Sequence, residues 1–271
     1  MKPITAVAAF LVLTLSARAG VHTEVVTYKD GEVVLEGYLA YDDRPILSPQ
    51  PTAAEAAMSR KRPGILVVHE WLGLNDHAKK RTEMLAELGF VAFACDMYGK
   101  GVRGAGPQDG PRLSAPFKDD RKLMRSRAAA GVEVLRRHAF VDPNKLAAIG
   151  FCFGGTTSLE LARAGTDLRG VVAFHAGLGT SMPAQPGQIK AKILVCEGGD
   201  DPHVPPPEVI AFEDEMRKAA ADWQVISYGG AVHSFTNPSA NDKAHGVCYN
   251  AEADRRSWLA MKDFFAEVFA K

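Results

Sequence analysis

Short apolar runs recur along the chain, and amphipathic stretches separate them. Runs of this kind are typical of strands covered on both faces, as in a mostly parallel sheet. Six are present, at residues 64–70, 90–96, 145–151, 170–176, 192–198 and 223–229. Stretches with the apolar spacing of helices lie between or after them, at residues 79–88, 119–138, 156–164, 207–220 and 254–270. This alternation predicts one α/β sandwich with a mostly parallel central sheet and helices on both faces.

An alternating pattern precedes the first of these runs. In TEVVTYKDGEVVLEGYLAY, residues 23–41, apolar and polar positions alternate on both sides of Lys29-Asp30-Gly31. Because an Asp-Gly pair favours the tight turn of a hairpin, this segment predicts an N-terminal β-hairpin.

Two polar segments interrupt the pattern. Residues 42–62 are rich in proline, and we expect them to form an excursion before the core. Residues 99–112 are rich in glycine and too long for a tight connection. We expect this second segment to be a mobile loop or a small cap over the carboxyl edge of the sheet, where such folds place their sites.

The first residues have a different pattern from the rest of the chain. Lys2 precedes the apolar run ITAVAAFLVLTL, and Ala17 and Ala19 flank Arg18. A basic start, an apolar run too short to span a bilayer comfortably and an A-x-A-like end are typical of a secretory signal peptide. The alternatives are a disordered start and an uncleaved anchor. We expect residues 1–19 to be a cleaved signal peptide and residues 20–271 to form a single domain that is periplasmic or secreted, without a membrane span.

The balance of charges argues against two classes of partner. The chain of 271 residues has 32 Lys and Arg against 32 Asp and Glu, so its formal net charge is zero. A chain with this balance does not favour nucleic acid or an anionic membrane. The sequence does not indicate an oligomeric state.

The four cysteines, Cys95, Cys152, Cys196 and Cys248, are widely spaced. Because they form no C-x-x-C pair, they do not predict a zinc site, and no motif indicates another metal or a cofactor. Cys95 and Cys196 end apolar runs and are expected to be buried thiols. Cys248 could take part in a disulfide in an oxidising compartment.

Cys152 stands in GFCFGG, between a predicted strand and a predicted helix. Gly150, Gly154 and Gly155 remove side chains that would clash in so sharp a turn. The arrangement matches the G-x-S-x-G nucleophile elbow of α/β hydrolases, with cysteine in place of serine. The elbow also sets the sulfur at a helix N-terminus, whose partial positive charge favours the thiolate. The pattern therefore indicates a nucleophile, and the alternative is a buried structural thiol.

Candidate acid and base residues follow Cys152 in the chain order of an α/β-hydrolase triad, which is nucleophile, acid, base. Asp200 and Asp201 come after the fifth apolar run, and His233 comes after the sixth. At these strand ends His233 would take the thiol proton or hold an ion pair with the thiolate, and one of the two aspartates would fix its tautomer.

A further carboxylate ends the first apolar run, in VVHEWLGLND. Trp71 occupies the position that supplies the second oxyanion-hole N–H in these folds, so the N–H groups of Trp71 and Phe153 are the predicted oxyanion hole. Glu70 would lie at the mouth of the site, where burial would raise its pKa. Its alternative role is an ion pair with a nearby Lys or Arg. We expect His77 to face solvent.

Together GFCFGG, DPHVPP, GGAVHSF and VVHEWLGLND resemble the motifs of the dienelactone hydrolase family, whose members are cysteine-dependent and have the α/β-hydrolase fold. The similarity runs from about residue 23 to the C-terminus. The resemblance implies a carboxylic ester or lactone hydrolase of the carboxymethylenebutenolidase type. It implies that Cys152 is the nucleophile, His233 the base and Asp201, rather than Asp200, the acid. It also implies that Glu70 contacts the resting cysteine and helps to generate the thiolate when substrate binds.

The chain departs from the family pattern at one substrate contact. Familiar members carry an arginine four residues after the catalytic histidine, where it grips the substrate carboxylate, and this chain has Asn237 there. A second family arginine falls in the cap region, where Arg103, Arg112 and Arg121 are candidates. Loss of one such contact weakens the expectation of a dienelactone substrate and leaves ester or lactone hydrolysis intact.

We therefore predict hydrolysis of small carboxylic esters or lactones through Cys152, His233 and Asp201, with a covalent acyl-cysteine intermediate and no cofactor. The alternative is a non-catalytic or thiol-redox protein on a hydrolase scaffold. A fold does not fix a function, and Cys152 could form a disulfide or a sulfenic acid in an oxidising compartment.

Overall fold

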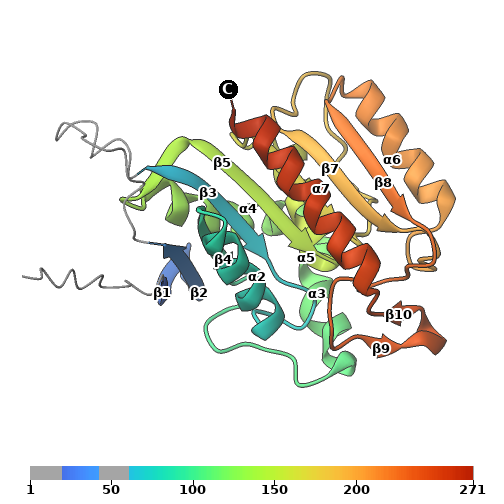
Figure 1. Ribbon diagram of the computed structural model, residues 1–271, viewed down its shortest axis with the longest axis horizontal. Helices are drawn as coiled ribbons and strands as arrows, with labels where there is room; N and C mark the ends of the chain where they lie inside the picture. Colours follow the sequence, from blue (N-terminus) through green and yellow to red (C-terminus); the bar gives the residue numbers. More distant parts are fainter. Residues whose placement is uncertain (1–19, 43–60, 271) are drawn as a thin grey trace, which may run out of the picture.

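The computed structural model describes residues 20–42 and 61–270. The strands of its main sheet are β1 Val21–Asp30, β2 Val33–Asp42, β3 Arg62–Val68, β4 Val91–Cys95, β5 Val141–Phe151, β6 Gly170–Phe174, β7 Lys192–Gly198 and β8 Trp223–Tyr228. They lie in the order β1-β2-β4-β3-β5-β6-β7-β8 (Figure 1). Pairing is parallel from β4 across to β8 and antiparallel for β1 with β2 and for β2 with β4. The predicted mostly parallel sheet with an N-terminal hairpin is confirmed.

Helices cover both faces of this sheet. They are α2 Asp76–Glu87, α4 Arg121–Arg137, α5 Phe153–Arg163, α6 Pro206–Lys218 and α7 Ala251–Phe269. Helices α2 and α7 pack into one apolar cluster, and α4, α5 and α6 pack into the other. Each predicted helical stretch is therefore a helix of the three-layer arrangement.

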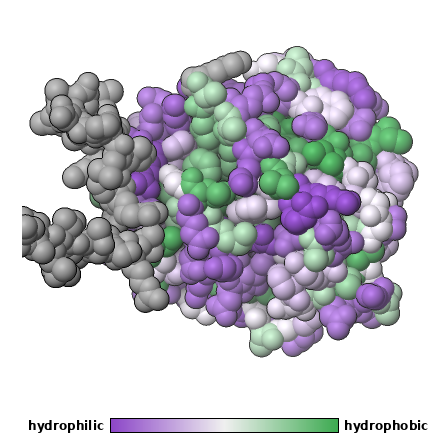
Figure 2. All heavy atoms as spheres, in the orientation of Figure 1, coloured by the Kyte–Doolittle hydropathy of each residue, from purple (hydrophilic) through white to green (hydrophobic). Residues whose placement is uncertain are grey.

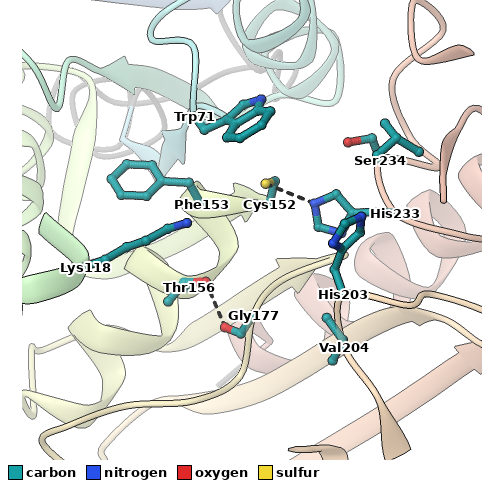
Figure 3. Close-up of a pocket in the computed structure, with 11 residues that line it drawn as sticks. Trp71, Lys118, Cys152, Phe153, Thr156, Gly177, His203, Val204, His233 and Ser234 are labelled. Carbon is teal, nitrogen blue, oxygen red and sulfur yellow. Dashed lines mark hydrogen bonds between the residues drawn. The ribbon is translucent and has the colours of Figure 1, made fainter. Parts of the chain in front are cut away.

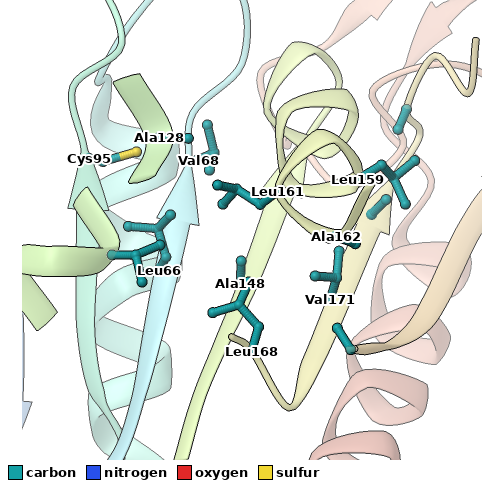
Figure 4. Packing of buried hydrophobic residues seen from close by; sticks show 14 of the residues in the cluster. Leu66, Val68, Cys95, Ala128, Ala148, Leu159, Leu161, Ala162, Leu168 and Val171 are labelled. Atoms are coloured by element: carbon teal, nitrogen blue, oxygen red, sulfur yellow. The ribbon is translucent and has the colours of Figure 1, made fainter. Parts of the chain in front are cut away.

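The strands divide their side chains between the two clusters because successive residues of a strand point to opposite faces. In β3, Leu66 and Val68 join the cluster under α4 and α5, and Ile65 and Val67 join the cluster under α2 and α7. Figure 4 shows the first of these clusters, where α5 lies over the sheet. Continuous apolar runs are therefore required in the central strands. At the edge of the sheet, β8 is only partly covered, since it has a neighbour on one side alone.

The N-terminal hairpin turns slightly later than the sequence indicates. Asp30 pairs with Val33, so the loop consists of Gly31 and Glu32, and Gly31 has a positive φ of 57°. Most of the polar segment at residues 42–62 lies outside the described residues, and so does the predicted signal peptide.

The glycine-rich segment at residues 99–112 is not a loop throughout. A short 3-10 turn, η1 Pro107–Asp109, leads into the helix α3 Gly110–Asp119. Our sequence interpretation missed this helix because Pro116 lies inside it and disfavours a helical interior. Its Phe117 is buried and packs edge-on against Phe153, at 6.0 Å between ring centroids. The predicted cap over the carboxyl edge is therefore a short helix tied to the elbow.

The described residues contain no helix suited to crossing a membrane. On the face drawn in Figure 2, hydrophilic residues lie between smaller groups of hydrophobic residues. Among residues 20–42 and 61–270, no helix has both the length and the apolar character to cross a bilayer.

The four cysteines all lie in the described ranges, and each is a free thiol. Cys95 and Cys196 are buried as expected, and Cys248 is half-buried.

Candidate active site

Cys152 forms a strained elbow between β5 and α5. Its φ is 54° and its ψ is −118°, a backbone conformation that L-residues rarely adopt and that costs about 1–3 kcal/mol. Its N–H donates to the carbonyl of Phe174 at 2.9 Å, and its carbonyl accepts from the N–H groups of Gly155 and Thr156. Strand and helix together therefore impose the elbow.

The glycines around Cys152 are required by close backbone approach. A β-carbon on Gly150 would collide with the carbonyl oxygen of Gly154, and a β-carbon on Gly154 would collide with the carbonyl oxygen of Val68 in β3. Both obstacles are backbone atoms, which cannot move aside without shifting the sheet or the helix. The clash inferred from the sequence is confirmed at both positions.

The structure brings Cys152, His233 and Asp201 together in a line of contacts. Nε2 of His233 lies 3.0 Å from Sγ of Cys152, and Nδ1 of His233 lies 2.8 Å from Oδ2 of Asp201. The other carboxylate oxygen of Asp201 accepts from the backbone N–H of His203 at 2.8 Å. Asp200 is exposed and forms no part of this line. Of the two candidate acids, Asp201 is therefore the one that contacts His233.

The electrostatics of this line favour a protonated His233. Burial by itself lowers the pKa of His233, but the facing Cys152 sulfur and the Asp201 carboxylate reverse that effect and raise the pKa well above its ordinary value. An imidazolium beside a sulfur stabilises the thiolate. The arrangement can therefore hold an ion pair between Cys152 and His233, ready for nucleophilic attack.

A small hairpin holds the loop that carries His233. It consists of β9 Asn241–Asp242, the 3-10 turn η2 Lys243–His245 and β10 Val247–Cys248. The N–H of His233 donates to the carbonyl of Gly246, and the N–H of Cys248 donates to the carbonyl of His233, both at 3.0 Å. These two bonds fix the backbone on both sides of His233.

The predicted oxyanion donors are free of protein acceptors. Among the described residues, neither the N–H of Trp71 nor the N–H of Phe153 donates a hydrogen bond. The backbone of Trp71 is held by its carbonyl, which accepts from the hydroxyl of Tyr98 at 2.8 Å. The Trp71 ring packs directly on Gly110 at the start of α3, where a β-carbon would collide with the indole. Both donors are therefore available to an oxyanion.

Glu70 lies beside this line and not in it. Oε2 of Glu70 accepts from Nδ2 of Asn237 at 2.7 Å, and Oε1 accepts a longer bond of 3.4 Å from the Ser234 hydroxyl. Its carboxylate has no hydrogen bond to Cys152 and no ion pair with Lys or Arg among the described residues. The alternative ion pair with Lys or Arg is therefore wrong, and the carboxylate is oriented towards the loop after His233.

The expected direction of the Glu70 pKa shift is also wrong. Burial by itself raises this pKa, but the facing His77 ring and the Asn237 amide overcome it and lower the pKa to about 2. Nδ1 of His77 is 3.6 Å from Oε2 of Glu70, too long for a good hydrogen bond but close enough for electrostatic stabilisation. Nε2 of His77 lies 3.2 Å from both the carbonyl oxygen of Thr236 and Nε of Arg81, so these contacts hold the ring beside Glu70.

His77 is a site residue that the sequence interpretation missed. Its side chain is only 9% exposed, whereas we expected it to face solvent. Its position in the first turn of α2 gave no signal, because its partners Glu70 and Thr236 come from two other segments of the chain. Only the assembled fold brings these groups together.

A cavity of about 370 Å³ opens above the sulfur (Figure 3). Its lining is mostly apolar, with Trp71 and Phe153 near Cys152 and Val204 farther along the wall. None of the three candidate cap arginines, Arg103, Arg112 and Arg121, lines it. This cavity has the concave apolar form expected of a small-molecule site. Within the described residues, no cluster of His, Cys, Asp and Glu could hold a metal ion.

The cap arginines have other partners. Nε of Arg103 donates to the carbonyl of Leu74, Arg112 pairs with Asp109 and Nη2 of Arg121 donates to the carbonyl of Gly179. The structure therefore does not bring any of them to the sulfur.

Comparisons with solved structures agree with the fold. A crystal structure described as "Dienelactone Hydrolase-like Promiscuous Phospotriesterase P91 from Metagenomic Libraries" is 40% identical, has a TM-score of 0.81, and covers 92% of this chain and 98% of its own. A second solved structure, "m3DLH", is 39% identical with a TM-score of 0.81 and covers 92% of this chain and 99% of its own. The chain therefore has the α/β-hydrolase fold.

The sequence comparisons specify the family. The model of the "Dienelactone hydrolase family" matches residues 51–269. A Bradyrhizobium sp. protein named "Probable 2-oxo-3-(5-oxofuran-2-ylidene)propanoate lactonase" is 30% identical over 217 residues, which cover 74% of this chain and 79% of that protein. "Protein usf" of Aquifex pyrophilus is 30% identical over 209 residues, which cover 76% of this chain and 88% of that protein. The chain belongs to the dienelactone hydrolase family and is a hydrolase.

Proposed function

We propose that this hydrolase cleaves small carboxylic esters or lactones by nucleophilic attack of Cys152, with His233 as base and Asp201 as the acid of the triad. The observation that carries the proposal is the continuous line from the Cys152 sulfur through the imidazole to a buried carboxylate, at 3.0 Å and 2.8 Å. The family membership and the name of the Bradyrhizobium relative support a lactone or ester as the substrate class.

In the first half of the reaction, the thiolate attacks the substrate carbonyl carbon and forms a tetrahedral oxyanion. The N–H groups of Trp71 and Phe153 donate to this oxygen. As the carbon–oxygen bond of the leaving group breaks, Nε2 of His233 donates its proton to the departing alkoxide. The product of this half is an acyl-cysteine and a free alcohol, or a ring-opened chain when the substrate is a lactone.

In the second half, neutral His233 accepts a proton from a water molecule, whose oxygen attacks the acyl carbon of the thioester. The second tetrahedral intermediate uses the same two donors, and its collapse releases the carboxylic acid and the Cys152 thiolate. Asp201 accepts from Nδ1 throughout, so it fixes the tautomer and stabilises the imidazolium each time it forms.

Glu70 supports this chemistry as a positioning residue for the loop that follows the base. Its bonds from Ser234 and Asn237 hold the two residues that flank the turn after His233. In this structure Glu70 accepts from Asn237 at 2.7 Å and does not make the contact with the resting cysteine that the family resemblance implies.

The test is hydrolysis of p-nitrophenyl acetate and of a dienelactone by the purified protein. We expect wild type to hydrolyse the simple ester and Cys152→Ala to lose that activity by about three orders of magnitude or more, in line with the removal of a triad nucleophile. Cys248→Ser is the matched control, since Cys248 is a half-buried free thiol outside the cavity. Equal activity in wild type and Cys152→Ala would refute the proposal.

The thiol-redox alternative has a separate test. A count of reactive thiols in native protein, with the labelled peptides identified, gives the oxidation state of Cys152. We expect Cys152 to be reduced and to react with iodoacetamide. If native protein instead contained Cys152 as a stable disulfide or sulfenic acid, the redox alternative would be favoured.

We propose phosphotriester cleavage as a secondary activity of the same site. The support is the 40% identity to the structure described as a promiscuous phosphotriesterase. Here the thiolate attacks phosphorus, an aryloxide leaves with its electron pair, and water then displaces the sulfur. Release of p-nitrophenol from paraoxon beyond one equivalent of protein, with loss in Cys152→Ala, is the expected result.

We also propose that the protein is exported and that residues 1–19 are removed. The support is the basic, apolar and small-residue pattern of the first residues, which lie outside the described part of the chain. The mass of the protein recovered from a periplasmic or secreted fraction tests this. We expect a chain that starts at Gly20, and a full-length chain in the cytoplasm would contradict the proposal.

A further inference from the structure

The cavity above Cys152 is lined by one Lys side chain and no Arg side chain. Of the residues that line it, Lys118 is the only Lys, Arg, Asp or Glu. Apolar side chains form much of the remaining wall, and the Thr156 hydroxyl is already used, since it donates to the carbonyl of Gly177 at 2.7 Å. His233 is engaged with Cys152 and Asp201, so an anionic group bound elsewhere in this cavity would meet Lys118.

Lys118 has no carboxylate partner within the described residues. It lies in the last turn of α3, where a positive charge is favoured by the helix dipole. Two nearby acidic side chains have other partners: Asp109 accepts from Arg112, and Oδ1 of Asp120 accepts from the first N–H groups of α4. The ammonium group is exposed and available to a ligand.

Other residues that could meet an anion are committed elsewhere. Arg103 donates to the carbonyls of Leu74 and Val102, and Arg121 donates to the carbonyl of Gly179. Asn237 stands where a cation is expected from the family pattern, but it is neutral and donates to Glu70. Of the Lys and Arg side chains in the described residues, Lys118 is therefore the one that lines the cavity and could meet an anion there.

The positions of Lys118 and His233 also indicate which part of a substrate would carry an anionic group. In Figure 3 the Lys118 ammonium and the His233 ring lie on opposite sides of the Cys152 sulfur. The leaving-group oxygen must face Nε2 of His233, because it receives its proton there. The acyl portion, which stays on the sulfur, then extends towards Lys118.

We propose that Lys118 is a specificity-determining residue that binds a carboxylate on the acyl portion of the substrate. This inference rests on the proposed ester or lactone hydrolysis and narrows its substrate class to half-esters of dicarboxylic acids and to lactones with a carboxylate on the acyl side. Lys118 acts as an exposed point charge, so salt screens its contribution.

The experiment compares two esters with acyl chains of equal length, mono-p-nitrophenyl adipate and p-nitrophenyl hexanoate. The measured quantity is the ratio of their kcat/KM values, at low and at high ionic strength. The variants are Lys118→Met, which removes the charge and keeps the length, and Lys118→Arg, which keeps the charge. Lys122→Met is the matched control, because Lys122 is exposed on the neighbouring helix and does not line the cavity.

We expect Lys118→Met to lower the adipate-to-hexanoate ratio about tenfold at low salt, and Lys118→Arg to restore most of it. In wild type, about 0.5 M salt should reduce the ratio towards that of Lys118→Met, and Lys122→Met should keep the wild-type ratio. An unchanged ratio in Lys118→Met, with both activities still dependent on Cys152, would overturn this inference and leave the proposed function intact. Hydrolysis of both esters by Cys152→Ala would instead overturn the proposed function.

Discussion

The buried carboxylate of Glu70 should make the unfolding free energy of the protein fall at acid pH. The side chain is buried, and its pKa falls from the ordinary value of 4.5 to about 2. A carboxyl with a depressed folded-state pKa stabilises the fold above its unfolded pKa, and the contribution is lost as pH falls towards the folded pKa. For Glu70 this loss occurs between about pH 5 and pH 2.

The magnitude follows from the difference between the two pKa values. At about 1.4 kcal/mol for each pH unit, the values of 4.5 and about 2 correspond to about 3 kcal/mol of unfolding free energy at pH 7. By the same linkage, about 2 kcal/mol of this is lost between pH 7 and pH 3. Glu70→Gln keeps the shape of the side chain and removes the titration.

The assay is urea unfolding of wild type and Glu70→Gln at pH 7 and pH 3. We expect wild type to lose about 2 kcal/mol more unfolding free energy than Glu70→Gln over this interval. Glu87→Gln is the control, because Glu87 is an exposed carboxylate at the end of α2 and should give the wild-type pH dependence. Parallel pH dependences for wild type and Glu70→Gln would refute the argument that Asn237 and His77 hold Glu70 ionised.

Three further substitutions test other parts of the site. Asp201→Asn removes one of the groups that raise the pKa of His233, so the pKa of His233 should fall. Iodoacetamide should then alkylate Cys152 more slowly at pH 6, and kcat/KM should fall by about two to four orders of magnitude. An unaltered alkylation rate and kcat/KM would contradict the role of the carboxylate. Gly154→Ala should lower the unfolding free energy by about 1–3 kcal/mol or more, because its β-carbon would collide with backbone. Gly229→Ala, with open space at its β-carbon position, should change the unfolding free energy little. Equal stability of the two variants in urea would contradict the tight elbow. Tyr98→Phe removes the hydroxyl that donates to the carbonyl of Trp71, whose N–H is a predicted oxyanion donor. We expect kcat/KM to fall about fivefold and the unfolding free energy to change by about 1 kcal/mol. An unchanged kcat/KM would show that this hydrogen bond does not position the donor.

The parts of the fold that the sequence predicts well are those set by local chemistry. Central strands must be apolar on both faces, so their runs are visible, and the elbow must have glycine wherever a β-carbon would meet backbone. For these reasons the sequence alone places Gly150, Cys152 and Gly154 in the elbow. The chain order of nucleophile, acid and base located His233 and narrowed the acid to two neighbouring aspartates.

Other features depend on contacts between distant segments, which no local pattern records. Helix α3 forms in spite of Pro116 because Leu113 and Phe117 are buried against the rest of the fold. The environment of Glu70 is assembled from α2 and from the loop after His233, so the sequence indicated burial but not the groups that outweigh it. The position of a side chain within a cap is likewise a property of the assembled fold, and Lys118 could not be distinguished from the cap arginines beforehand.

The central claim is that Cys152 carries the acyl group during turnover, and acid-quenched mass spectrometry tests it most directly. The protein is mixed with excess p-nitrophenyl acetate, quenched during steady-state hydrolysis and digested, and the acylated peptide is identified. We predict one acetyl group on the peptide that contains Cys152, which disappears when the ester is exhausted and does not form in Cys152→Ala. Steady-state hydrolysis with Cys152 unmodified, or with the acetyl group on another residue whose replacement abolishes activity, would contradict the account.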